Sequence, residues 1–270
     1  MDKLKTYLKH PLSFVLLILI GLASIITVAS IIFIIIYILV NGIPNLTTDL
    51  FSLHYNSKNQ SMLPSIFNTV FITFLTLLIA VPIGIFSAVY LVEYAKKGSK
   101  LVKVIRVTTE TLAGIPSIVF GLFGFLAFVI ALGWGYSMIA GVLTLVMMVL
   151  PTIIRTTEEA LLAVPNSYRE GSFGLGAGKI RTIFKIIVPT AIPGILSGVI
   201  LAIGRIVGET AALIYTSGTV AETATSLTDS ARTLSVHLYC LLSEGLFTNQ
   251  AYATAVTSKV SWDVRFRTEA

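Results

Sequence analysis

The stretch REGSFGLGAGKIRTIFKIIVP, from Arg169 to Pro189, separates two long apolar runs in this 270-residue chain. It holds four glycines and four basic residues, whereas the runs before it (Ser137 to Ile154) and at its end (Ile186 to Ile214) are almost wholly apolar. Each run is close to or above the length of about 20 residues with which a helix crosses a bilayer. The stretch therefore predicts a polar connection between two membrane-spanning helices.

The composition of the whole chain agrees with a membrane location. Hydrophobic residues make up 55% of the sequence and charged residues 12%, and the mean hydropathy is +0.90. Because a soluble domain carries about 25% charged residues, too few polar side chains are present to cover a globular surface. We assign the net charge of +6 to cytoplasmic membrane loops and predict no nucleic-acid partner. The single cysteine, Cys240, provides neither a disulfide framework nor a multi-cysteine metal site.

Apolar runs along the chain predict an all-α polytopic membrane protein with five clear spans. The predicted spans are Pro11 to Val40, Met62 to Val92, Leu112 to Leu132, Ser137 to Ile154 and Ile186 to Ile214.

The distribution of basic residues predicts how these spans are oriented. Lysines or arginines cluster at the N-terminus, after the second span and after the fourth, whereas the two loops 41–61 and 133–136 contain only Lys58. The positive-inside rule therefore places the N-terminus and the long connection 155–185 in the cytoplasm. The outer segment Thr216 to Asp229 is rich in Thr, Ser and Ala, and we interpret it as a flexible surface loop.

The letters GLGAGK, Gly174 to Lys179, suggest a phosphate-binding P-loop at first sight. The P-loop pattern requires Ser or Thr after the lysine, but Ile180 stands there, and Phe173 occupies the position of the first glycine. We therefore predict no nucleotide, metal or other cofactor site in this chain. Nor do the spans contain a nucleophile with a base, so no catalytic residue is predicted.

The same stretch fits another pattern, the "EAA" loop of ABC-importer permeases, which it resembles in spacing. Glu170, Gly171 and Ser172 stand where the pattern has Glu-Ala-Ala, and Gly176 fills its glycine position. The pattern closes with Ile186, Val188 and Pro189. The resemblance implies the transmembrane domain of a type I ABC importer, with a short helix in 155–185 that docks onto an ATPase subunit. An ordinary glycine-rich turn between helices is the alternative.

Two membrane motifs narrow the resemblance to the phosphate branch of these permeases. They are ETLAGIPSIVFGLFGF, Glu110 to Phe125, and GRIVGETAALIYTSG, Gly204 to Gly218, and the resemblance extends from Leu12 to about Ala255. It implies a permease subunit of an ATP-driven phosphate importer in the cytoplasmic membrane of a prokaryote, in contact with membrane lipid. The implied partners are a second, related permease, two ATPase subunits and an extracytoplasmic phosphate-binding protein. An importer of another oxyanion or solute is one alternative, and an ATP-independent channel or secondary carrier is another.

Arg205 and Glu209 form an i,i+4 pair inside the fifth predicted span. A charge in the middle of a membrane helix costs roughly 2.5–3.5 kcal/mol, so it persists where it faces a bundle interior, a water-filled path or a partner. The Arg205 guanidinium matches phosphate oxygens in a planar fork, and Glu209 would hold it in place as a counter-charge. The alternative is an ion pair that only packs helices. Pro116 and Ser117 in the third span are further pathway candidates, with a simple helix kink as their alternative.

Permeases of this family close with a sixth span, and here the corresponding segment begins as NQAYATAV, Asn249 to Val256. Charged residues then follow at Lys259, Asp263, Arg265, Arg267 and Glu269. We therefore expect the sixth span to be lost or truncated. Residues 1–255 are predicted to form the transmembrane domain and residues 256–270 an atypical polar tail.

Overall fold

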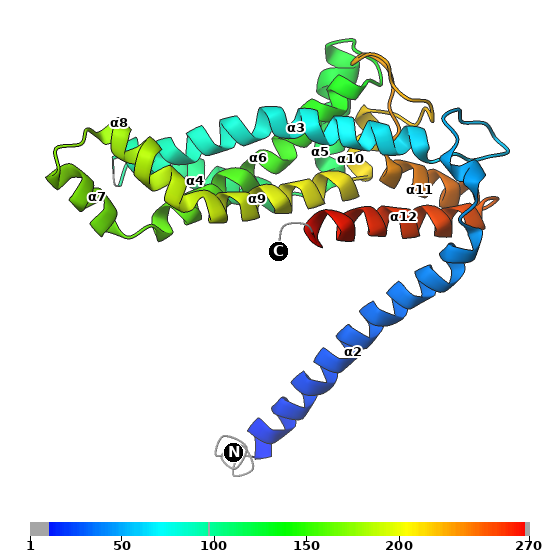
Figure 1. The fold of residues 1–270 in the computed structure, drawn as a ribbon, viewed down its shortest axis with the longest axis horizontal. Helices are drawn as coiled ribbons and strands as arrows, with labels where there is room; N and C mark the ends of the chain where they lie inside the picture. The colour runs from blue at the N-terminus through cyan, green and yellow to red at the C-terminus, as the bar shows by residue number, and fades with distance from the viewer. Residues whose placement is uncertain (1–10, 97, 268–270) are drawn as a thin grey trace. The chain divides into compact units, whose positions relative to one another are not determined.

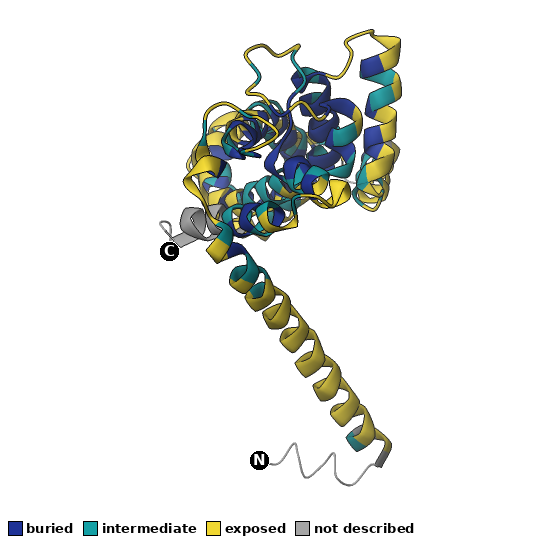
Figure 2. Cartoon of the chain, turned by 90° about the vertical axis from the view of Figure 1, so that its right-hand side faces the viewer, coloured by how far each residue is buried: buried dark blue, intermediate teal, exposed yellow. Residues whose placement is uncertain are grey.

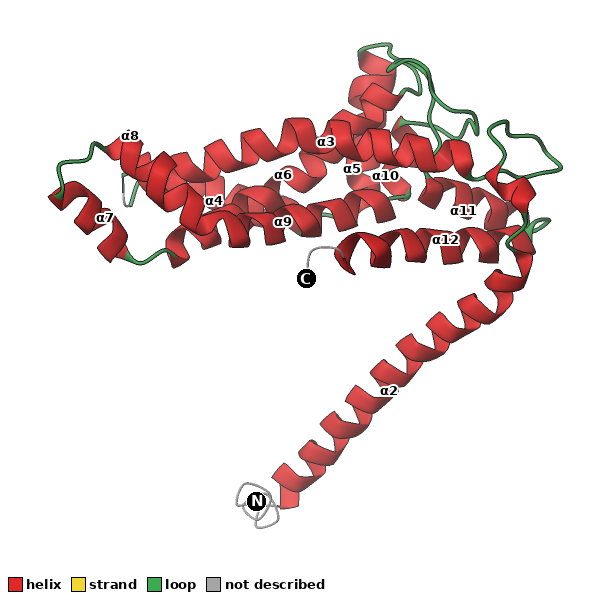
Figure 3. Ribbon diagram, viewed as in Figure 1, coloured by secondary structure: helices red, strands yellow, loops and turns green. Residues whose placement is uncertain are grey.

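The computed structural model describes residues 11–96 and 98–267, and every regular element among these residues is a helix (Figure 3). The predicted all-α class is therefore confirmed. The chain divides into two compact units, residues 1–47 with 245–270 and residues 48–244, which are described separately. The N-terminal lysines Lys3, Lys5 and Lys9, on which the predicted orientation partly rests, lie outside the described residues, as do Lys97 and Glu269.

The first unit consists of α2 (Pro11–Gly42), η1 (Ile43–Asn45) and α12 (Thr248–Arg267) (Figure 1). No charged residue interrupts the 32 positions of α2, which at 1.5 Å per residue is about 48 Å long and can cross a bilayer. α12 packs against the end of α2, where the rings of Tyr37 and Tyr252 meet edge to face with centroids 5.9 Å apart. Gly42 permits this approach, because a Cβ there would collide with the Tyr252 carbonyl group and the Val256 side chain.

α12 also contains the boundary at which the sequence suggests a separate tail. Val256 lies inside this helix, so residues 248–255 and 256–267 share one continuous backbone helix. α12 is not among the described helices that are apolar enough to cross a membrane.

The second unit is built around three long helices that pack side by side (Figure 1). They are α3 (Leu63–Val89), α6 (Met138–Ala163) and α9 (Val188–Gly208). In lipid, close approach through small residues holds such helices together. Gly84 of α3 faces Ile153 of α6, and Gly198 of α9 faces Thr156 of α6, each at a position where a Cβ would collide. α6 is therefore the central helix, with buried residues along its length. Figure 2 shows the buried residues gathered inside the bundle.

The second and fourth predicted spans are helical, but both helices run further than predicted. A π-helical turn, η3 (Tyr90–Tyr94), extends α3, and α6 continues past Ile154 to Ala163. The connection predicted to start at Arg155 therefore begins only after Ala163. The last turns of α6 therefore include charged residues that the sequence analysis places in the connection.

The third predicted span, Leu112 to Leu132, is not one straight helix. It is divided among α4 (Lys100–Ala113), α5 (Ser117–Gly124) and the π-helical η4 (Phe125–Ala131). The chain bends by 101° between α4 and the α5–η4 segment. Pro116 explains the break, because it lacks a backbone N–H and disfavours a helical residue before it. The described residues thus contain four continuous apolar spans, or five if this bent pair counts as one.

The fifth predicted span differs at both ends. A continuous helix starts at α8 (Lys179–Thr182), passes through η5 (Ile183–Ile187) and α9, and stops at Gly208. A separate helix, α10 (Ala211–Thr216), follows the break. A further short helix, α7 (Asn166–Gly174), lies between α6 and α8.

The connections at the other end of the unit are η2 (Thr48–Phe51), a loop over residues 217–233 and α11 (Leu234–Glu244). The loop is tied to the rest of the unit by hydrogen bonds from buried side chains. Its first residue, Ser217, is buried and donates its hydroxyl hydrogen to the Ala231 carbonyl oxygen at 2.7 Å. Asn68 of α3 donates to the carbonyl oxygens of Glu222 and Arg232, at 3.0 and 3.2 Å. These bonds fix both ends of the loop against the bundle.

Candidate functional site

The predicted ATPase-coupling residues lie on and directly after α7. Glu170 and Gly171 are exposed, and no atom lies near the position that a Cβ of Gly171 would take. Ser172 is different: it is 6% exposed, and its Oγ lies 2.8 Å from Oγ1 of Thr182 in α8. Ser172 therefore holds α7 and α8 together and does not belong to the exposed face.

Gly176 ends α7 in a way that requires glycine. Its φ of +79° is left-handed, a region that side chains with a Cβ rarely adopt. The Gly176 N–H donates to the Phe173 carbonyl oxygen at 2.9 Å, and the Ala177 N–H donates to the Ser172 carbonyl oxygen at 3.1 Å. This pair of bonds is a Schellman cap, which satisfies the last carbonyl groups of the helix. The glycine position of the sequence pattern thus has a local backbone cause.

Arg169, which the sequence pattern does not single out, fixes the inner side of α7. Its guanidinium donates two hydrogen bonds to Oε1 of Glu93 in η3, at 2.7 and 3.1 Å. It also donates to the carbonyl oxygens of Leu161 and Val164 at the end of α6, at 3.1 and 2.9 Å. Both members of the ion pair are largely buried, with side chains 16% and 10% exposed. Arg169 therefore joins α7 to two spans of the bundle.

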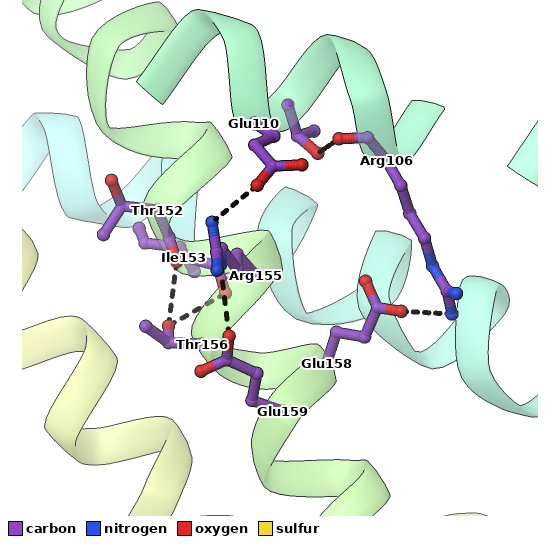
Figure 4. Close-up of polar contacts among 9 residues, drawn as sticks. Arg106, Glu110, Thr152, Ile153, Arg155, Thr156, Glu158 and Glu159 are labelled. Carbon is purple, nitrogen blue, oxygen red and sulfur yellow. Dashed lines mark hydrogen bonds and ion pairs between the residues drawn. The ribbon is translucent and has the colours of Figure 1, made fainter. Parts of the chain in front are cut away.

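A second charged cluster lies between α4 and the end of α6 (Figure 4). Arg106 of α4 pairs with Glu158 of α6, and Arg155 of α6 lies 3.1 Å from Glu159 and 3.7 Å from Glu110 of α4. These side chains line a cavity of about 220 Å³. Glu158 is the most buried of them, with an 11% exposed side chain, whereas Arg155 is 55% exposed. The cluster is mixed in sign, so it ties two helices together and offers no strongly cationic surface.

An apolar cavity of about 400 Å³ lies along the same helices, between α4, α5 and α6. Its lining includes Leu112, Ile115, Val119, Phe123, Met147 and Pro151. The predicted pathway residues Pro116 and Ser117 are not part of this lining: Pro116 is exposed at the bend, and Ser117 begins α5. Pro116 marks the bend between α4 and α5.

The predicted ion pair between Arg205 and Glu209 is not formed in the described part of the chain. α9 ends at Gly208, and Glu209 has an extended backbone with φ −73° and ψ 130°, so the two residues do not share a helix face. Instead, Oε1 of Glu209 accepts a hydrogen bond from the Ala212 N–H at 3.1 Å, and Glu209 is 8% exposed. Arg205 lies partly buried in the last turn of α9, where a cation is favoured by the helix dipole.

On the opposite side of the second unit, His237 of α11 is fully buried. Its Nδ1 lies 3.1 Å from Nη1 of Arg232, and Arg232 also lies over the Tyr55 ring and donates to the Thr219 carbonyl oxygen. Burial, together with the nearby Arg232 charge, lowers the pKa of His237 to about 4. This group joins the loops that hold Tyr55 and Thr219 to α11, as a neutral histidine beside a cation.

The apolar spans, with a short, exposed helix inserted between two of them, define a multi-span membrane protein. The family described as "Binding-protein-dependent transport system inner membrane component" matches residues 80–243, which is more than half of the chain. The chain belongs to this family. The matched residues include α7, Gly176, Arg205 and Glu209.

Individual relatives agree with this membership. The chain is 38% identical over 200 residues to "Probable ABC transporter permease protein YqgI" of Bacillus subtilis, covering 73% of this chain and 68% of the relative. It is 45% identical over 140 residues to "Phosphate transport system permease protein PstA 1" of Mycobacterium tuberculosis, covering 52% and 45%. It is 36% identical over 178 residues to the PstA protein of Xylella fastidiosa, covering 65% and 62%. The chain thus spans between 45% and 68% of the length of these relatives.

A solved structure shows the same fold. A chain of a bacterial alginate ABC transporter, crystallised in complex with a periplasmic protein that carries an alginate pentasaccharide, superposes with a TM-score of 0.70 at 16% identity. The match covers 96% of this chain and 93% of that chain. The resemblance to ABC-importer permeases is therefore confirmed in sequence and in fold.

Proposed function

We propose that this protein is a membrane-spanning permease subunit of an ATP-driven phosphate importer. It forms one half of the translocation pathway, and a second, related permease supplies the other half. One combination of features carries the proposal, and both features lie within the residues that match the family. α7 is exposed where the sequence pattern predicts ATPase docking, and Arg205 lies next to the break that ends α9. Relatives named for phosphate transport support phosphate as the cargo.

The exposed face of α7 and the turn after it is the proposed docking surface for an ATPase subunit. Glu170 supplies a carboxylate, and two large apolar side chains that follow it in the chain are uncovered, with Phe173 48% and Leu175 91% exposed. Because exposed apolar groups next to a polar rim mark sites of protein association, this face suits a partner better than water. Gly171 leaves room for close approach.

Arg205 is the proposed phosphate contact. With Glu209 committed to the Ala212 N–H, the guanidinium has no carboxylate partner among the described residues and keeps its planar donors for an anion. Glu209 then acts by shaping the break after α9 and not as the counter-charge that the sequence spacing suggests. A cation without a tight partner suits transport, because a passing anion gains a contact that it is able to leave again.

The remaining partners follow from the same family architecture. Two ATPase subunits bind at the α7 faces of the two permeases, and an extracytoplasmic phosphate-binding protein delivers the anion to the opposite side. The N-terminus and α7 lie in the cytoplasm, in agreement with the basic residues of the inner connections. The protein resides in the cytoplasmic membrane of a prokaryote, and ATP is hydrolysed on the separate ATPase chains.

Phosphate uptake into vesicles that contain the complete transporter tests this function. Replacing Arg205 with Gln should lower uptake by about tenfold or more, because a charge-assisted hydrogen bond contributes roughly 1.5–3 kcal/mol. Arg205→Lys should retain little uptake, since a point charge replaces a planar fork. Parental vesicles that import sulfate but not phosphate would contradict the cargo assignment. Uptake by Arg205→Gln at the parental level would contradict the role of Arg205.

A further inference from the structure

The junction between α7 and the bundle is built from charged and polar groups, although it lies beside apolar spans. Arg169 reaches from α7 to Glu93, which lies 76 positions earlier in the chain, and to two carbonyl groups at the end of α6. Five donors of a guanidinium have a fixed planar arrangement, so these contacts define the position of α7 along two directions. One side chain therefore contacts both spans.

Burial makes the pair difficult to separate. The Arg169 and Glu93 side chains are 16% and 10% exposed, and Nη2 of Arg169 lies 2.7 Å from Oε1 of Glu93. Breaking a buried pair leaves an uncompensated charge, which is strongly unfavourable. A force applied to α7 is therefore transmitted to η3 more readily than it separates the pair.

Two further contacts join α8 to η3 and to α7. Nζ of Lys179, at the start of α8, lies 4.6 Å from the centre of the Tyr94 ring, which is also in η3. Ser172 and Thr182 join α7 to α8 through their hydroxyl groups, 2.8 Å apart. η3 is a π-helical turn, a feature that is frequent at functional sites in helices. α7, α8 and the end of α3 thus form one connected body.

We propose that the Arg169–Glu93 pair is the link through which movement of the docked α7 reaches α3 and α6. This proposal rests on the proposed function, since it requires that α7 is the helix an ATPase subunit moves. Arg169 is a positioning residue. Glu170 and the exposed apolar groups contact the ATPase, and Arg169 transmits the movement of α7 to α3 and α6. Loss of the pair should let α7 move while α3 stays behind.

Coupling between ATP hydrolysis and uptake, measured in the same vesicles with the complete transporter, tests the proposal. Arg169→Gln and Glu93→Gln should each raise the number of ATP molecules hydrolysed per phosphate imported by about tenfold, which lies in the usual range of coupling between sites. Arg169→Lys should recover part of the coupling. Lys103→Gln is the matched control, because it removes one exposed positive charge from α4 and should leave the ratio unchanged.

A purely structural role would give a different result. In that case hydrolysis and uptake would fall together, or the ATPase subunits would no longer co-purify, and either outcome would overturn the proposed link.

Spin labels test the link without reference to the cargo. Ser167→Cys in α7 and Lys96→Cys after η3 are exposed sites, introduced into a Cys240→Ser background. The distance between the labels should stay constant when nucleotide is trapped on the ATPase subunits, and it should change in the Arg169→Gln variant. A distance that changes equally in both proteins would overturn the link even if phosphate proved not to be the cargo.

Discussion

Glu209 and Ala212 are joined by a hydrogen bond of 3.1 Å from the backbone N–H of Ala212 to Oε1 of Glu209. The carboxylate therefore supports the start of α10 and does not pair with Arg205. In its position before a helix, this acceptor satisfies one of the free N–H groups of the first turn. The charge of Glu209 matters less in this arrangement than its ability to accept a hydrogen bond.

We predict that Glu209→Ala lowers the stability of the subunit by about 1 kcal/mol, the usual effect of losing such an acceptor. Glu209→Gln keeps an acceptor oxygen and should cost less than half as much. Thermal unfolding of the purified subunit in detergent, followed by intrinsic fluorescence, measures the difference. If the Gln variant is as unstable as the Ala variant, the negative charge of Glu209 is required, as its interpretation as a counter-charge for Arg205 demands.

Gly176 should be intolerant of substitution for a local reason. We expect Gly176→Ala to destabilise the protein by about 1–2 kcal/mol, because φ +79° is strained for any residue with a Cβ. Gly174→Ala is the matched control: Gly174 is in α7, has no atom near its Cβ position, and should gain stability from a better helix former. Thermal unfolding of the two variants should shift in opposite directions, and a shift in the same direction would contradict the cap.

Docking of the ATPase is therefore better tested at Gly171 than at Gly176. Gly171→Arg adds a large side chain beside Glu170 on the exposed face, without strain in the backbone. We predict that the variant folds and inserts normally but no longer co-purifies with the ATPase subunit. The matched control is Ser57→Arg, which adds the same side chain at an exposed turn of the loop between η2 and α3, predicted to face outward. If Gly171→Arg still co-purifies with the ATPase subunit, the docking surface does not lie on α7.

The apolar spans are predictable because hydrophobic length is a local property of the sequence. The sequence pattern predicts that Gly176 occupies a special position. The reason, a left-handed helix cap, is visible only in the backbone of the structure. The spacing of Arg205 and Glu209 misleads, because an i,i+4 pair is adjacent only if the helix is continuous, and here it stops at Gly208. The Arg169–Glu93 pair joins residues 76 positions apart, so no local spacing reveals it.

The α4–α6 cluster should be stabilised mainly by its most buried member. Glu158→Gln should lower stability by about 1.5–3 kcal/mol, because a largely buried carboxylate loses its charge-assisted bond to Arg106. Glu110→Gln should change stability by less than about 1 kcal/mol, since the Glu110–Arg155 pair is exposed to solvent. Thermal unfolding of both variants in the same detergent provides the comparison, and equal effects would show that burial does not rank these pairs.

His237 should make the stability of the second unit depend on pH. Its pKa is lowered to about 4 in the folded protein, first by burial and then by Arg232, from an ordinary value of about 6.5. The neutral Nδ1 accepts from the guanidinium of Arg232, and protonation of this nitrogen would place two cations 3.1 Å apart. Because the unfolded chain takes up the proton first, stability is complete above pH 6.5 and falls as the pH decreases from 6.5 to 4.

The expected loss over that window is up to about 3 kcal/mol, because each tenfold difference in proton affinity between the folded and unfolded chain corresponds to roughly 1.4 kcal/mol. The midpoint of thermal unfolding should therefore decrease between pH 6.5 and 4, and His237→Gln, which cannot take up a proton in this range, should flatten that part of the curve. His54→Gln changes an exposed histidine in the same unit and should leave the slope unchanged. A His237→Gln curve parallel to that of the parent would show that another group, not His237, sets the response to acid.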